Sequence, residues 1–472
     1  MPVVARCNHF LSDIVAVGRS ALILLGFCLS GHGYVQAQES TEGTQPPTAG
    51  PGVAGDEPVA PTATAATPQD ESPPAQGNQD VQPVNQDCVQ KIIDQQALTR
   101  KIRAINNKLA RIDEKQFLLI KRNVATGIQQ GAANAADLEN LSLCLKYRLF
   151  QATDPVFVAN PDNVKNLFNE MDREIRSAGS QIGNAQEQKK YRQKYCDAVL
   201  VAAKQMFDNS LDARAVAIQV LKELYLAKTE SRTETHSESL AALVGLLKDT
   251  EQPDSVKDLA AAAIAFVQAN TAVIPQEQDA VSDAIAAELG RSCTETGYQL
   301  DLVDTLLFVS IARKSVGAPQ TTVMRTFVKL VEDRERPLQV RCRAAYGIGQ
   351  GAFDNKVDFD PLTWKVANLA LEASVFFNQK PGDPAWQQCG ADLFFALRHA
   401  DKNGLAKQPP MLPQGMMNRA PQSIAVKESA DLMIKIAVPL VMNKAKVPQA
   451  DQAALKAWID ANTALDAKPW GN

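Results

Sequence analysis

The sequence predicts an all-α protein. Alanine and leucine, which are strong helix formers, predominate, while aromatic residues make up only 6% of the 472 residues. Apolar residues recur at spacings of three and four positions, as at Ile102, Ile105, Leu109 and Ile112, and this period places them on one face of a helix. No alternating run of β-branched residues reaches the length of a strand, so we expect few or no strands.

Residues 1–37 show the order of segments that is typical of an export signal. Arg6 and Arg19 precede the apolar run 21–29, and residues 35–37 (VQA) provide a small-residue cleavage site. The run is too short to span a bilayer comfortably, and no later stretch is apolar enough to do so. We therefore expect a signal peptide, no transmembrane span in the mature chain, and a location in the periplasm, the cell envelope or the extracellular space.

Two alternatives to a cleaved signal remain open. The long basic region and the apolar character of residues 15–17 favour an uncleaved N-terminal anchor. Cys28 is a candidate for lipid attachment, but the preceding Phe27 is bulky at a position where a small residue is required.

Residues 38–86 have a different composition from the rest of the chain. They contain nine prolines, seven acidic residues and no Lys or Arg. Such a segment buries too little apolar surface to offset its chain entropy, so we expect a disordered acidic linker rich in Pro, Ala, Thr and Gln. Because the whole chain has a net charge of −4, the remainder is close to neutral, and nothing indicates nucleic acid as a partner.

Residues 87–180 are expected to form an N-terminal helical region. The helix around residues 102–112 carries basic residues on its remaining faces, which we interpret as a solvated surface in preference to a site for an anionic polymer. Further helices are expected over residues 138–149 and from about residue 163, where the Asn160-Pro161-Asp162 turn provides a start similar to an N-cap.

Five segments between residues 187 and 400 repeat one pattern at intervals of 42 to 45 residues. Each has an apolar or small first position, a second position that is often basic, and small or apolar residues at the fifth and ninth positions. Another apolar helix precedes each copy, and a short polar turn joins the two. The first positions are Ala213, Val256, Tyr298, Val340 and Ala385.

This two-helix unit resembles the HEAT or armadillo class of helical repeats, whereas a tetratricopeptide array repeats at about 34 residues. The resemblance is good in VRCRAA (340–345) and VKDLAA (256–261), and it is weak where Gln299 and Trp386 replace the basic residue. It implies a right-handed α-solenoid of HEAT-like hairpins over residues 187–400, in which each hairpin buries the apolar face of its neighbour.

Gly347, Gly349 and Gly351 raise the alternative of a phosphate-binding loop. A dinucleotide-binding loop needs a buried strand before it and the spacing G-x-G-x-x-G, and the sequence offers neither here. We expect Gly347 inside a repeat helix, with Gly349 and Gly351 at the helix end, where glycine adopts the left-handed conformation at low cost.

Residues 401–472 are expected to form an irregular loop and C-terminal capping helices. The helices are expected over residues 424–442 and 449–463, and Pro439 is expected to kink or shorten the first. A terminal pair with a polar outer face would cover the end of a repeat array.

Six cysteines follow the predicted signal, and an even number in an exported chain favours disulfides. Fifteen pairings are possible, and the spacing does not select among them. In the alternative interpretation they are small buried hydrophobic residues of helices. The six are Cys88, Cys144, Cys196, Cys293, Cys342 and Cys389.

The sequence offers no constellation that indicates catalysis, a cofactor or a metal. Beyond the predicted signal the only histidines are His236 and His399, which we interpret as surface or helix-capping residues. Trp364, Trp386 and Trp470 are candidates for lining a groove, but their helical spacing favours the core. A carboxylate pair is defined by its geometry in space, so the sequence leaves that possibility open.

We therefore expect an exported, non-catalytic helical-repeat scaffold without a cofactor, which binds a protein or another macromolecule of the envelope. This function rests on analogy with HEAT-like arrays, and the identity of the partner does not follow from the sequence. Two alternatives remain: an envelope hydrolase with a carboxylate-based site, and a structural envelope component whose acidic linker acts as a spacer.

Overall fold

The structure is a computed structural model, in which the chain divides into two units, Met1–Pro83 and Val84–Asn472. All described residues belong to the second unit: 90–91, 93–95, 97, 99–100, 114–131, 135–228, 233–270, 275–291, 294–312, 321–353, 357–398, 415–443 and 445–466. Several expected features lie outside them: the signal peptide, the acidic linker, the helix around residues 102–112, Cys88, Cys293, His399 and Trp470.

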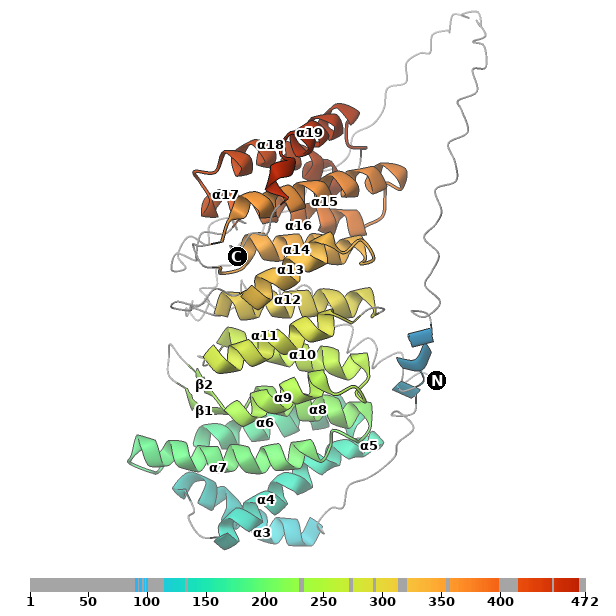
Figure 1. The fold of residues 1–472 in the computed structure, drawn as a ribbon. Coiled ribbons are helices and arrows are strands. Elements are labelled where there is room, and N and C mark those ends of the chain that lie inside the picture. Colours follow the sequence, from blue (N-terminus) through green and yellow to red (C-terminus); the bar gives the residue numbers. More distant parts are fainter. Residues whose placement is uncertain are drawn as a thin grey trace, which may run out of the picture. The chain divides into compact units, whose positions relative to one another are not determined.

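The described part of the chain is mostly helical (Figure 1). The N-terminal group of helices contains α4, which contacts α3 and α7, and α6, which contacts α3, α7 and α8. The side chain of Asn160 accepts the backbone N–H of Asp162 at 3.0 Å and caps α6. The elements of this group are α3 (Glu114–Gln130), α4 (Ala135–Phe150), η1 (Gln151–Thr153), α5 (Pro155–Val158) and α6 (Pro161–Ser177).

Ten helices follow in five successive pairs. Within each pair the two helices contact each other. The helices are α7 (Ala185–Lys204), α8 (Leu211–Lys222), α9 (Ser237–Lys248), α10 (Asp254–Asn270), α11 (Pro275–Leu289), α12 (Thr296–Ala312), α13 (Thr321–Glu332), α14 (Leu338–Gln350), α15 (Phe359–Gln379) and α16 (Ala385–Leu397).

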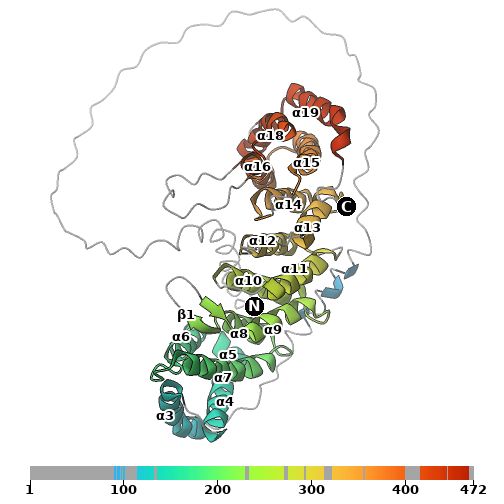
Figure 2. The same ribbon diagram turned by 60° about the vertical axis from the view of Figure 1, so that its left-hand side comes forward.

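The paired helices lie in two rows, which Figures 1 and 2 show from two directions. The second helices of the pairs form one row, in which α8, α10, α12, α14 and α16 each contact the next. The first helices, α7, α9, α11, α13 and α15, form the other row in the same way. Each helix therefore buries its apolar face against its own partner and against the adjacent pairs.

The repeat positions found in the sequence form the contact surface of the row α8 to α16. The residues at the fifth position, Ala217, Ala260, Leu302, Ala344 and Cys389, are at most 1% exposed. Three of them are alanines, whose small side chains allow helix axes to approach to about 8–10 Å.

In four of the five copies the second position of the pattern carries a buried side chain that joins neighbouring pairs. Arg341, which is 4% exposed, donates from Nε to the carbonyl of Val331 at the end of α13, at 3.0 Å. Its two Nη atoms donate to the carboxylate of Glu372 on α15, at 2.6 and 2.8 Å. Lys257 makes the corresponding forward contact, with Nζ 3.2 Å from the carboxylate of Glu288 on α11.

In the two copies that lack a basic residue at this position, another side chain donates to a carbonyl earlier in the same pair, as Arg341 does to Val331. Gln299 donates to the carbonyl of Thr294 at 2.7 Å, and its own oxygen accepts from Arg336 of the next pair at 3.0 Å. The indole of Trp386 donates to the carbonyl of Lys380 at 2.9 Å. Gln299 therefore links neighbouring pairs as Arg341 does, whereas the indole of the half-buried Trp386 bonds a carbonyl of its own pair.

Gly349 and Gly351 lie at the end of α14 as expected, but the expected left-handed conformation was wrong. α14 continues through Gly349 to Gln350, and Gly351 caps it with φ −61°, which is not the left-handed region. Glycine is needed at these positions because of close packing: a Cβ on Gly349 would lie 2.1 Å from the carbonyl oxygen of Ala396 on α16. Gly347 lies inside α14 as expected, against the ring of Phe327.

Two short strands join α8 to α9: β1 (Tyr225–Lys228) pairs antiparallel with β2 (Thr233–Thr235). β1 packs against α7, where Arg192 donates to the carbonyl of Leu226 at 3.3 Å. These strands agree with the expectation of few or none, and they place the residue that follows β2 beside α7.

The last helices, α17 (Met416–Arg419), α18 (Ile424–Met442) and α19 (Gln449–Ala461), are followed by η2 (Thr463–Leu465). α18 has the predicted bounds, and Pro439 lies inside it without ending it. The two helices of this last pair take the opposite places from those in the earlier pairs. The first helix, α18, packs on α16, in the row of second helices, and the second helix, α19, packs on α15, in the row of first helices. No helix in the described ranges has the length and apolar character needed to cross a membrane.

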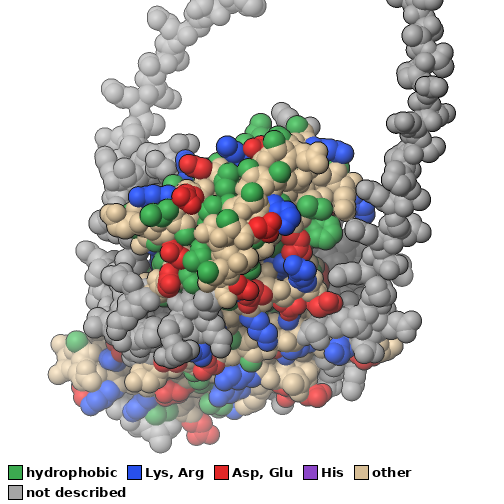
Figure 3. All heavy atoms as spheres, turned by 45° about the horizontal axis from the view of Figure 1, so that its top comes forward, with side chains coloured by type: hydrophobic (Ala, Val, Ile, Leu, Met, Phe, Trp, Pro, Cys, Tyr) green, Lys and Arg blue, Asp and Glu red, His purple; other side chains and the backbone are tan. Residues whose placement is uncertain are grey.

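The α18–α19 end of the protein has a mixed outer surface. Figure 3 brings this end forward and shows side chains of both charges interspersed with hydrophobic ones. On α18 the exposed residues include Lys427, Glu428 and Lys435 beside Ile424 and Val438.

Replacing Gly349 with alanine should destabilise the protein by about 3 kcal/mol or more, because the new methyl group would overlap backbone atoms of α16 that have no room to move. Gly245→Ala is the matched control: Gly245 is also inside a helix, but a Cβ there meets no atom within 4 Å. This control should gain about 0.5–1 kcal/mol from helix propensity. Denaturant unfolding of both variants measures the difference, and equal effects would contradict the packing argument.

Arg341→Ala should destabilise the protein by about 3 kcal/mol, since it removes a buried guanidinium and leaves Glu372 without that partner. The value lies at the low end for a buried pair because the Glu372 side chain is 25% exposed. Arg334→Ala, at an exposed position in the preceding turn, should change the stability by less than about 0.5 kcal/mol. Thermal unfolding of the two variants provides the test, and similar midpoints would count against the linking role of Arg341.

Candidate functional site

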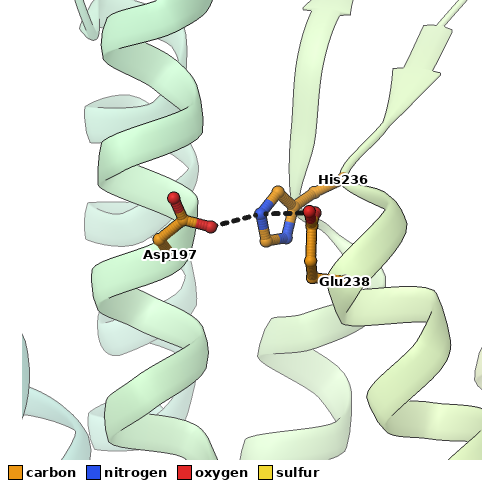
Figure 4. A group of neighbouring side chains, drawn as sticks. All are labelled: Asp197, His236 and Glu238. Atoms are coloured by element: carbon orange, nitrogen blue, oxygen red, sulfur yellow. Dashed lines mark hydrogen bonds and ion pairs between the residues drawn. The ribbon is translucent and has the colours of Figure 1, made fainter.

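One histidine and two carboxylates converge where the β-hairpin meets α7. Asp197 lies on α7, His236 lies between β2 and α9, and Glu238 lies in the first turn of α9. Figure 4 shows both carboxylates directed at the same ring nitrogen. Nε2 of His236 is 3.0 Å from Oδ1 of Asp197 and 3.2 Å from Oε2 of Glu238.

The second ring nitrogen of His236 is also held in place. Nδ1 lies 2.7 Å from the hydroxyl oxygen of Ser239, which is 1% exposed. The imidazole itself is completely buried, whereas the side chains of Asp197 and Glu238 are 49% and 58% exposed. The cluster therefore has a buried side, formed by His236 and Ser239, and a solvent-exposed side, formed by the two carboxylates.

A fourth side chain contacts both carboxylates. Nε2 of Gln193, one turn before Asp197 on α7, donates to Oδ1 of Asp197 at 3.1 Å and to Oε2 of Glu238 at 3.2 Å. Partial burial opposes ionisation of Glu238, but hydrogen bonds from its own backbone N–H and from Gln193, with the nearby His236, hold the pKa of Glu238 below its usual value. The amide of Gln193 therefore bridges the two carboxylates.

His236 was expected to be a surface or helix-capping residue, and the surface position was wrong. It occupies the N-cap position of α9, but its side chain makes no capping hydrogen bond and is fully buried. The sequence feature that could have indicated the cluster is a single histidine in a polar run, close to Glu238 and Ser239. The missing partner, Asp197, is 39 residues away, and the β-hairpin that brings it close was not foreseen.

A second polar cluster lies between α12, α14 and α16. Nε of Arg343 is 3.5 Å from Oδ1 of Asp304 and 3.4 Å from Oδ2 of Asp392. Asp392 is only 2% exposed, and Gln388 donates to its Oδ1 at 2.8 Å. Burial raises the pKa of Asp392 to about 7, with a further contribution from Asp304 and opposition from Arg343. The guanidinium of Arg343 therefore lies close to two carboxylates. Asp392, the more buried of the two, stays protonated to a higher pH than an exposed aspartate does.

The structure pairs two of the six expected cysteines. Cys342 on α14 and Cys389 on α16 form a disulfide between neighbouring helices of the row. Cys144 and Cys196 are free and buried, as in the alternative interpretation. Burial raises the pKa of the Cys144 thiol to about 11 and that of Cys196 to about 12, so both are poor nucleophiles.

The described tryptophans serve packing, as expected. Trp364 and Trp386 are partly buried against the core. The indole of Trp364 donates to the carbonyl of Ile459 on α19 at 3.2 Å, which fastens the last helix to α15.

Comparisons with known proteins add no assignment. No protein family matches this chain, and no curated protein matches it either. What the chain does is therefore argued from its own residues.

Asp392→Asn should change the pH dependence of stability. The folded-state pKa of Asp392 lies above the ordinary value of 3.8, so folding takes up a proton, and stability falls as the pH rises from about 4 through about 7. Asparagine does not ionise, so its stability relative to the wild type should improve over this interval. Unfolding free energies at about pH 5 and about pH 8 measure this, and a constant difference between the two proteins would contradict the raised pKa.

Proposed function

We propose that residues 187–400 form a right-handed α-solenoid of HEAT-like hairpins, and that the protein is an exported, non-catalytic scaffold that binds a protein partner. The two rows of stacked helices support the repeat architecture, since each helix contacts the helix two positions later in the chain. The helices α18 and α19 act as a cap in this proposal, because they pack on α16 and α15 at the end of the two rows and carry charged side chains on their mixed outer surface.

The observation that carries the binding proposal is a strip of half-exposed side chains along α10, α12, α14 and α16, which we name the aromatic strip. Phe266, Phe308 and Phe395 occupy equivalent positions in three repeat units, and each is half-buried. Tyr346 and Arg343 continue the strip on α14. Aromatic and arginine side chains that are already ordered bind a partner at low entropic cost.

The charges beside the aromatic strip indicate the kind of partner. Asp301 and Asp304 on α12 are half-exposed, and Arg343 stands next to them on α14. A protein segment that alternates apolar and charged side chains matches this arrangement. A hydrolase based on the Asp304–Asp392 pair has less support, because Asp392 is 2% exposed and does not reach a substrate.

A photocrosslinking amino acid placed at Phe308 should trap one partner of defined mass in the native cell envelope. The same replacement at Phe266 should trap the same partner, since both positions lie on the aromatic strip. Phe376 on α15, in the other row, is the matched control: it is a phenylalanine that is 47% exposed, and it should give no adduct. Adducts at Phe376 alone, or at none of the three positions, would refute binding through the strip.

A further inference from the structure

The cluster of Asp197, His236 and Glu238 contains the atoms that transition metals prefer. Imidazole nitrogen and carboxylate oxygen together are typical ligands of Zn²⁺, while Mg²⁺ and Ca²⁺ favour oxygen alone. The three candidate ligand atoms, Nε2, Oδ1 and Oε2, all lie within 4.8 Å of one another. We propose that these three residues bind one divalent transition-metal ion, with Zn²⁺ as the probe.

The spacing of the ligand atoms fits a metal ion with little rearrangement. A tetrahedral ion with bonds of about 2.0–2.2 Å holds its ligand atoms about 3.3–3.6 Å apart. Nε2 of His236 is already 3.0 and 3.2 Å from the two carboxylate oxygens. Each carboxylate oxygen must therefore move a few tenths of an ångström away from Nε2 to make room for the ion. Both carboxylates are exposed to solvent, so they are free to move by this amount.

The surroundings of His236 match those of a metal ligand. A ligating histidine usually donates its other ring N–H to an oxygen atom, which fixes the tautomer and the ring orientation. Ser239 provides that oxygen, 2.7 Å from Nδ1. In this tautomer Nε2 presents a lone pair to the space between Asp197 and Glu238.

Charge also favours a cation at this position. Two carboxylates share a single ring nitrogen, so with a neutral imidazole the cluster carries two negative charges, which one divalent ion neutralises. Gln193 contacts both carboxylate oxygens through its amide, and rotation of that amide by half a turn places its oxygen where the nitrogen stands. Gln193 is therefore the fourth ligand, on the side that is open to solvent.

The metal would join two successive helical pairs. Asp197 and Gln193 belong to α7, whereas His236 and Glu238 belong to the entry of α9. The ion fastens the β-hairpin connection between these helices, and it stabilises the folded state by an amount that grows with the logarithm of its concentration relative to its Kd.

Calorimetry of the purified full-length chain, stripped with a chelator, tests the proposal directly. Zn²⁺ should bind with a stoichiometry of one and a Kd of about 10 µM or below, and should raise the thermal midpoint. Glu238→Gln and Asp197→Asn should each weaken binding at least about tenfold, and Ser239→Ala should weaken it about 10- to 100-fold through the ring orientation. Circular dichroism of each variant confirms that it is folded.

Glu187→Gln is the matched control for Glu238→Gln. Glu187 lies in the first turn of α7, as Glu238 does in α9, and its side chain is 57% exposed against 58%. This control should bind Zn²⁺ as the wild type does. The proposal is overturned if the wild type does not bind Zn²⁺, if Glu238→Gln binds it equally well, or if Mg²⁺ or Ca²⁺ competes for it at equal concentration.

Discussion

A buried side chain at the second position of the sequence pattern links one helical pair to the next in four of the five pairs, through Arg214, Lys257, Gln299 and Arg341. A buried donor without an acceptor costs about 1–3 kcal/mol, so this side chain must find one. In Arg341 and Gln299 it finds a backbone carbonyl of its own pair and a side chain of the next pair. The carbonyls at a helix end lack partners within the helix, so one side chain satisfies them and also sets the register between pairs.

Three features reinforce the contact between α14 and α16. Gly349 allows the two backbones to approach, Gln350 donates to the carbonyl of Phe395, and Cys342 and Cys389 form a covalent link. The next interface follows the same rule, since a Cβ on Gly390 would meet the backbone of α18. The last two helices take the opposite places from those in the earlier pairs, so the sequence pattern no longer specifies their position. Close packing of α16 against both α14 and α18 holds them there.

Features with a local or periodic cause could be predicted from the sequence, and those that depend on distant partners could not. The bounds of α18 and the columns of buried residues follow from apolar spacing alone. The reversed order of α18 and α19 depends on which helix faces α16, which no local pattern encodes. The copies at Gln299 and Trp386 match the pattern weakly because the pattern records charge, whereas in the structure both side chains act as hydrogen-bond donors.

The candidate sites show where polar chemistry arises in this fold. His236 meets Asp197 across 39 residues, and Arg343 meets Asp392 across about one repeat interval. In stacked helical pairs, side chains on facing surfaces are neighbours when their separation is close to the repeat length. Polar groups drawn together in this way lie at the boundaries between pairs, where a carboxylate of one pair faces a donor of the next. Asp197 could not be paired with His236 from the sequence for this reason, whereas the closely spaced glycines of α14 reflect local packing.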